Sequence, residues 1–251
     1  MFRPAPIVLA VSLSFALIGS TQAAPIPANI TKALADPARP AADLARDATR
    51  YPGELLAFAG VKPGAQVADF IIGGGYFTRI LSAAVGPKGH VTAYQPAEFI
   101  QFQASYGENL KTVVAAYKNI TPLSSGLQVM DLPDKLDLVM TVQNYHDLHL
   151  GPFPKDTAAK VNAEVFKSLK PGGVFLIVDH AAAAGSGISV ADTLHRIDIA
   201  AVKSEVEAAG FKLAGESSML AASADPHTAN VFDPVIRGKT DQFVLKFVKP
   251  R

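Results

Sequence analysis

Short apolar runs alternate along most of the chain with segments whose apolar residues recur every three or four positions. Runs of β-branched and aromatic residues bounded by Gly and Pro predict strands, whereas the helical spacing predicts amphipathic helices. The predicted strands are residues 66–71, 90–94, 126–130, 136–142, 173–179, 211–217 and 241–248. The predicted helices are residues 76–85, 97–117, 156–169 and 191–209.

This alternation predicts an α/β fold with a doubly wound, seven-stranded, mostly parallel sheet and helices on both faces. A polar loop rather than a helix separates the last two predicted strands, so we expect the last strand to pair antiparallel. In such sheets ligands bind at the carboxyl ends of the strands. Functional residues are therefore expected on the loops that follow residues 71, 94, 130, 142 and 179.

The first residues combine a basic start at Arg3, an apolar stretch and the sequence Thr21-Gln22-Ala23. This pattern predicts a secretory signal peptide over residues 1–23, with an uncleaved N-terminal anchor as the alternative. Residues 24–45 are interpreted as an Ala/Pro-rich leader with a short helix, and residues 46–251 as the main domain. We expect a periplasmic or secreted protein with no stable membrane span after signal cleavage.

Composition narrows the possible partners. The chain has 23 Lys and Arg against 22 Asp and Glu, without a basic patch, so nucleic acid is not an expected partner. It has no cysteine, which excludes a disulfide framework, a thiolate metal site and a lipid anchor on cysteine. A small molecule is the expected substrate, and the sequence leaves the oligomeric state open.

Three consecutive glycines follow the first predicted strand and lead into a helical pattern. A dinucleotide fold needs Gly-x-Gly-x-x-Gly, and counting from Gly73 puts Thr78 at the third glycine position. The phosphate-loop ending Gly-Lys-Ser/Thr is also missing. The turn is open enough for a ligand to approach backbone, but a tight strand-to-helix turn without any ligand is the competing interpretation.

The segment "VADFIIGGGYFT" resembles the first motif of class I S-adenosylmethionine-dependent methyltransferases, in which an acidic residue precedes Gly-x-Gly-x-Gly. Asp69 is the acidic residue, Gly73 and Gly75 match two glycines, and Ile71 departs from the third. "DKLDLVMTVQNYHDLH" and "LKPGGVFLIVDH" resemble the strands and loops that follow in that family. More narrowly, "NYHDLH", "VDH", "LHRID" and "VFDPVIRGKTDQFVLKF" resemble a group of secreted bacterial methyltransferases. The resemblance covers the chain from about Arg46 to its end.

The resemblance implies S-adenosylmethionine (SAM) as cofactor and places it against specific residues. Asp69 would lie beside the cationic methionine end, where a carboxylate offsets positive charge. Gly73 and Gly75 would let the cofactor lie against backbone, and Thr78 would open the next helix. The full set of implied cofactor-binding residues is Asp69, Gly73, Gly75, Thr78, Gln95, Asp131 and Asn144.

Gln95 is a second departure from the family. The family usually ends its second strand with Asp or Glu, which accepts hydrogen bonds from both ribose hydroxyls. Gln95 has one oxygen acceptor, so it would hold one hydroxyl and weaken the ribose contact by about 1 to 3 kcal/mol. Asp131 would accept a hydrogen bond from the adenine amino group.

The loop after the fourth predicted strand carries the catalytic candidates. Methyl transfer is an in-line displacement that requires alignment of donor and acceptor. A hydroxyl or protonated amine acceptor also needs a general base, and histidine has a suitable pKa. We expect His146 to be the base, His180 to be the second choice and Tyr145 to line the methyl or acceptor pocket.

Two other interpretations of these histidines remain open. His146-x-x-His149 with Asp147, Asp179 and His180 would converge as metal ligands, although the favoured interpretation assigns no metal. Alternatively, the histidines only orient loops, and Arg196 pairs with Asp198.

An exported chain also conflicts with a charged cofactor made in the cytoplasm. A second hypothesis is therefore a secreted protein that keeps the methyltransferase fold, binds another small molecule and lacks methyl-transfer activity. A metal-dependent hydrolase is a weaker third.

Overall fold

The computed structural model describes residues 25–251, so the predicted signal peptide lies outside the described residues. Its centre is a seven-stranded sheet in the order β3-β2-β1-β4-β5-β7-β6. Only β7 runs antiparallel to its neighbours, whereas the other pairings are parallel. The strands are β1 (Gln66–Phe70), β2 (His90–Tyr94), β3 (Ile120–Leu123), β4 (Leu136–Val142), β5 (Leu169–His180), β6 (Lys212–Ser217) and β7 (Gln242–Val248).

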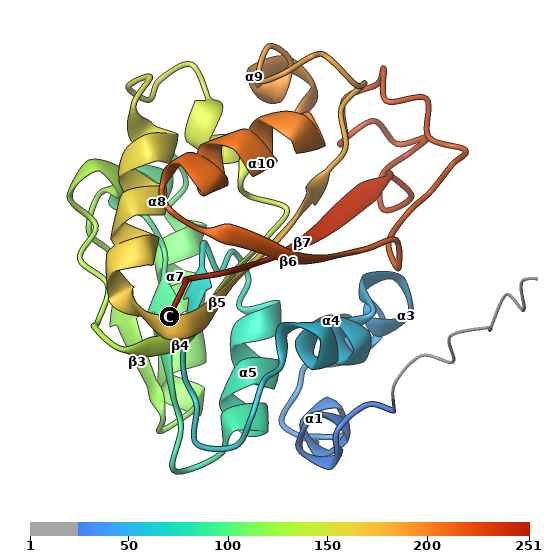
Figure 1. Cartoon of the computed structure of the whole chain (residues 1–251). Coiled ribbons are helices and arrows are strands. Elements are labelled where there is room, and N and C mark those ends of the chain that lie inside the picture. The colour runs from blue at the N-terminus through green and yellow to red at the C-terminus, as the bar shows by residue number, and fades with distance from the viewer. Residues whose placement is uncertain (1–24) are drawn as a thin grey trace, which may run out of the picture.

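Helices cover both faces of this sheet (Figure 1). One face carries α1 (Ala28–Leu34), α4 (Pro52–Ala59), α5 (Tyr76–Val85) and α7 (Ser105–Ala116), whose buried side chains share one apolar cluster. The opposite face carries α8 (Thr157–Ser168) and α10 (Ile199–Ala208), which belong to a second cluster. The remaining short helices are α2 (Ala41–Leu44), α3 (Asp47–Arg50), α6 (Ala97–Phe102), α9 (Ala191–Leu194) and the 3-10 turns η1 (Leu127–Val129) and η2 (His146–His149).

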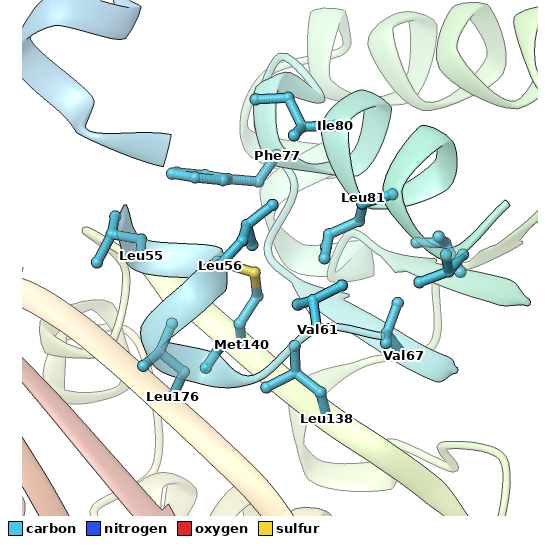
Figure 2. Packing of buried hydrophobic residues seen from close by; sticks show 14 of the residues in the cluster. Leu55, Leu56, Val61, Val67, Phe77, Ile80, Leu81, Leu138, Met140 and Leu176 are labelled. Atoms are coloured by element: carbon cyan, nitrogen blue, oxygen red, sulfur yellow. The ribbon is translucent and has the colours of Figure 1, made fainter. Parts of the chain in front are cut away.

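Alternation along the central strand β4 separates the two clusters. Leu138 and Met140 point into the first cluster, where they lie near α4 and α5 (Figure 2), while Val139 belongs to the second. All three side chains are at most 3% exposed. Successive residues of a strand point to opposite faces, so a strand buried on both sides reads as a continuous apolar run.

The structure confirms the predicted fold class, and β2, β4 and α5 have the predicted bounds. The predicted strand at residues 126–130 is wrong, because this segment contains η1, and the third strand is Ile120–Leu123. Pro122 explains the error: proline argues against a strand in sequence, but β3 is an edge strand, where proline is tolerated. The predicted helix over 97–117 is broken at Gln103, which is extended, and that over 191–209 is broken after α9.

The segment interpreted as an Ala/Pro-rich leader with a short helix contains α1, which packs against the sheet's first apolar cluster. Within α1, Ile30 and Ala33 are buried in the first cluster, and the Asn29 side-chain amide donates to the carbonyl of Ala84 on α5 (3.1 Å). Among residues 25–251, no helix combines the length and the apolar character that a bilayer crossing requires.

Candidate functional site

The glycine turn after β1 is held in a left-handed conformation. Gly73 and Gly75 have φ values of +55° and +76°, and Ile71, at the departure from the family's first glycine, has φ +64°. The backbone N–H groups of Ile71 and Ile72 donate to the carbonyl of Tyr94 at the end of β2 (2.9 and 3.2 Å). A β-branched residue with positive φ is a genuine outlier. The turn therefore keeps a glycine-like backbone although the residue is isoleucine.

The two matching glycines have different surroundings. A Cβ atom on Gly73 would meet no heavy atom within 4 Å, so the backbone of this residue is open on that side. A Cβ atom on Gly75 would collide with the side chain of Val113 on α7. The expected role at the cofactor thus fits Gly73, whereas Gly75 is required for packing of the turn against α7.

Asp69, the penultimate residue of β1, is a buried carboxylate and is 4% exposed. Its Oδ2 accepts a hydrogen bond from the hydroxyl of Thr78 on α5 (2.6 Å). Burial raises the pKa of Asp69 to about 6, although Thr78 and the charge of Arg50 act in the opposite direction. Thr78 accordingly orients Asp69, which is a more specific role than opening the helix.

Gln95 follows β2 and is fully buried. Its Oε1 accepts a hydrogen bond from the N–H of Gly73 (3.0 Å), while its Nε2 has no hydrogen-bond partner among the described residues. The Oε1 atom that is expected to accept from a ribose hydroxyl already accepts one hydrogen bond from the glycine turn. The free group is a donor, and a buried donor without a partner is costly.

Three arginines from the N-terminal segment lie around Tyr76, the first residue of α5. The guanidinium carbons of Arg39, Arg46 and Arg50 lie 5.7, 5.3 and 4.9 Å from the ring centroid of Tyr76. The Tyr76 hydroxyl donates to Asp47 (2.6 Å), which also pairs with Arg39 (2.6 Å). These contacts fix α3 over the glycine turn.

Arg50 reaches from α3 to the end of β4. Its guanidinium donates to Oε1 of Gln143 (2.7 Å), which has φ +66°. Burial lowers the pKa of Arg50 to about 10, so the side chain remains a cation at neutral pH. The positive charge of Arg50 also acts to lower the pKa of Asp69, although burial raises this pKa overall. Arg50 and Gln143 were not predicted from the sequence, because they are 93 residues apart and belong to no motif.

His146 is fixed by Asp179 at the end of β5. The ring Nδ1 lies 2.8 Å from Oδ1 of Asp179, and the backbone N–H of His146 donates to Oδ2 (2.6 Å). The ring Nε2 lies 3.2 Å from Oδ1 of Asp147. Burial alone would lower the pKa of His146, but the two carboxylates outweigh it and raise this pKa to about 10. In this arrangement the ring is a protonated donor at neutral pH, which does not suit the expected general base.

Three further groups complete the His146 cluster. The side-chain amide of Asn144 donates to Oδ2 of Asp147 (2.9 Å), so Asn144 supports the cluster. His195 lies with its Nδ1 4.0 Å from Oδ1 of Asp147, and its backbone is left-handed, with φ +53°. The ring of His180 lies 6.1 Å from that of His146. In the sequence, His195 was marked only by the segment "LHRID", which did not predict a function for this residue.

His180 has the opposite electrostatic character to His146. Its Nδ1 pairs with the hydroxyl of Thr240 (2.8 Å). Burial, assisted by the positive charges of His146 and Arg196, lowers the pKa of His180 to about 4. His180 is therefore a neutral imidazole at neutral pH, with Nε2 as its remaining nitrogen.

Tyr145 and His149, which also belong to the loop after β4, both contact Glu205 on α10. Tyr145 is fully buried in the second cluster, and its hydroxyl pairs with Glu205 (2.9 Å) and Asn162 (2.7 Å). His149 also contacts Glu205 (3.1 Å). Tyr145 therefore packs below α8 and α10 and does not line the expected methyl pocket.

Asp131 does not join the site. Its side chain is 85% exposed and lies 3.5 Å from Lys167 on α8, so the structure gives no support for its expected adenine contact. The expected Arg196–Asp198 pair is also wrong. Arg196 forms a buried pair with Asp225 (2.8 Å), and Asp198 caps α10 through the N–H of Ala200 (2.9 Å).

A cleft of about 670 Å³ opens at the same sheet edge, beyond the end of β5. Its lining includes Ala181, Glu216, His227 and Asp241. His180 directly precedes Ala181 of this lining, so the cleft begins at the end of β5.

No family model and no curated protein matches this chain. Solved structures are similar to it. A SAM-dependent methyltransferase from Aquifex aeolicus has 21% identity and a TM-score of 0.59, with 87% of this chain and 96% of that chain covered. The fibrillarin of Aeropyrum pernix, with natively bound SAM, has 16% identity and a TM-score of 0.51, with 81% and 76% covered. The [4+2]-cyclase SpnF has 15% identity and a TM-score of 0.53, with 84% and 81% covered.

These similarities establish the class of fold: the chain has the α/β fold of SAM-dependent methyltransferases. A fold of this kind also carries other chemistry, as the cyclase illustrates, so function has to be argued from the site.

Proposed function

We propose that this protein binds SAM against the glycine turn and transfers its methyl group to a small-molecule acceptor. The observation that carries the proposal is the open backbone of Gly73 in the turn that follows β1, at the carboxyl edge of a sheet with methyltransferase topology. Ligands of doubly wound sheets bind at this edge. The Aeropyrum pernix fibrillarin, which has a similar fold, natively binds SAM.

The pair of opposite charges at the β1 and β4 ends suits the methionine end of SAM. Asp69 would bind the ammonium group and offset the sulfonium charge. Arg50 would bind the carboxylate through its planar donor fork. Because Arg50 already donates to Gln143, ligand binding would exchange this contact for a carboxylate contact of the same polarity.

Gln95 would contact the ribose as a donor. Its Nε2 is the buried group without a partner, and a ribose hydroxyl oxygen accepts such a hydrogen bond. The hydrogen bond from Gly73 to Oε1 fixes the orientation of the amide. A neutral donor thus replaces the family's carboxylate.

The transfer step requires a nucleophile aligned with the methyl carbon. SAM would supply an electrophilic methyl group, and its sulfur would leave as a neutral thioether when the nucleophile bonds to the methyl carbon. His180 would accept the proton from the acceptor through Nε2, because among residues 25–251 only its Nδ1 is paired, with Thr240, whereas both ring nitrogens of His146 already face carboxylates.

We also propose that the chain is exported after removal of residues 1–23, like the secreted bacterial group that its sequence resembles. An exported enzyme would need SAM outside the cytoplasm. Intact-mass measurement on the periplasmic fraction tests export: a mature chain beginning at Ala24 is expected, and a full-length chain confined to the cytoplasm would contradict it.

Calorimetric titration of residues 24–251 with SAM tests the proposed function. We expect one site per chain and micromolar affinity. Asp69→Asn keeps the shape of the side chain but removes a charge-assisted contact, so affinity should fall about 10-fold or more. Asp137→Asn is the matched control, because Asp137 contacts Lys170 and lies at the opposite end of β4. A wild-type chain without binding heat and without thermal protection would refute the proposal and favour a ligand other than SAM.

A further inference from the structure

Three potential ligand atoms converge beside the end of β4. They come from His146, Asp147 and His195, each of which offers one ligand atom, and these atoms all lie within 4.8 Å of one another. We propose that these three side chains bind a divalent transition-metal ion, a function that methyl transfer does not require.

The separations are close to those of a coordination sphere. Metal–nitrogen and metal–oxygen bonds of about 2.0 to 2.2 Å place neighbouring ligand atoms roughly 3.0 to 3.5 Å apart. His146 Nε2 and Asp147 Oδ1 are 3.2 Å apart, within this range. His195 Nδ1 is 4.0 Å from the same oxygen and has to approach by less than about 1 Å. Its side chain is 25% exposed, which leaves room for this movement.

Outer hydrogen bonds already orient two of the ligands. Asp179 accepts from Nδ1 of His146 and so directs Nε2 towards Asp147. Asn144 donates to Oδ2 of Asp147, which leaves Oδ1 towards the two histidines. Metal-binding histidines almost always have a partner on the second ring nitrogen, often a carboxylate. Asp179 supplies this partner from a fully buried position on β5.

The third ligand occupies a strained position. His195 ends α9 with φ +53°, and strained backbone persists where the surrounding structure enforces it. Its ring packs edge-on against the ring of Phe232, with centroids 4.9 Å apart. The other nearby histidines have different partners, since His149 contacts Glu205 and His180 contacts Thr240.

The ligand set defines the class of ion. Two imidazoles and one carboxylate suit Zn²⁺, Co²⁺, Fe²⁺ or Mn²⁺ and leave coordination positions open for water or a substrate oxygen. A thiolate-selective ion is not expected, because the chain has no cysteine. The ion would lie on the acceptor side of the sheet edge, whereas the glycine turn belongs to the proposed SAM site. Metal binding can therefore be measured without SAM, and its failure would leave the SAM proposal untouched.

The test is a titration of the tag-free mature chain with Co²⁺, followed by absorption and calorimetry, and repeated with Zn²⁺. We expect one ion per chain and visible Co²⁺ bands of a nitrogen and oxygen site. His195→Asn tolerates the left-handed backbone but removes the imidazole, so affinity should fall about 100-fold or more. Asp147→Asn should also weaken binding.

His227→Asn is the matched control for this titration. His227 is also left-handed, with φ +61°, and also contacts an aspartate, Asp241 at 2.9 Å, but it lies outside the cluster. Its substitution should leave Co²⁺ affinity unchanged. The proposal is overturned if the wild-type chain binds neither ion, or if His195→Asn binds as tightly as wild type. Circular dichroism of each variant checks that a loss of binding is not a loss of folding.

Discussion

Ile71 offers a direct test of the backbone geometry of the glycine turn. Its φ of +64° is left-handed, which costs an L-residue about 1 to 2 kcal/mol. The side chain is 4% exposed, so truncation also removes apolar burial. Comparison of Ile71→Gly with Ile71→Ala separates the two effects, because only glycine releases the backbone strain.

Val161 provides the reference in an ordinary helix. It is fully buried in the middle of α8, where glycine is less stable than alanine by about 1 kcal/mol, before the loss of one buried carbon is added. The same backbone entropy and the same lost carbon apply at residue 71, but strain release opposes them there. The stability gap between glycine and alanine should therefore be about 1 to 2 kcal/mol smaller at residue 71 than at residue 161.

Urea unfolding of the four variants measures these gaps, provided that the slope with denaturant stays constant. Equal gaps at the two positions, within about 0.5 kcal/mol, would mean that residue 71 is not left-handed in solution. The expected result would mean that the departure from glycine costs stability and leaves the shape of the turn unchanged.

Two further predictions concern packing and protonation. Gly75→Ala should destabilise the chain by several kcal/mol, because the added methyl group overpacks the contact with Val113 and the left-handed backbone is strained. In urea unfolding, adding Val113→Ala should restore part of this loss. No recovery in the double variant would contradict the packing role of Gly75. In metal-free protein, His146 is protonated with a pKa of about 10, above its usual 6.5, so its stabilising contribution is complete below pH 6.5 and is lost as pH rises through 10. The ring resonances of His146 should not titrate between pH 5 and 8. Asp179→Asn should flatten the fall in stability between pH 7 and 9. A titration midpoint of His146 near pH 6.5 in the wild-type chain would refute the arrangement.

The sequence predicted the sheet well because apolar runs, glycines and prolines mark its elements locally. β3 was not predicted because it contains Pro122, and proline argues against a strand unless the strand lies at the edge of the sheet. The site was predicted less completely, because strand ends can be located in sequence but side-chain directions cannot. Tyr145 follows β4 as expected, yet its hydroxyl points towards Glu205. Arg50 and His195 enter the site through tertiary packing of short helices, for which no spacing rule exists.

The central claim is that the glycine turn binds SAM, and native mass spectrometry of the mature chain tests it most directly. After incubation with SAM, we expect one molecule of SAM per chain, and its loss in Asp69→Asn but not in Asp137→Asn. A chain that remains unliganded at saturating SAM, or that retains a different metabolite, would contradict the claim.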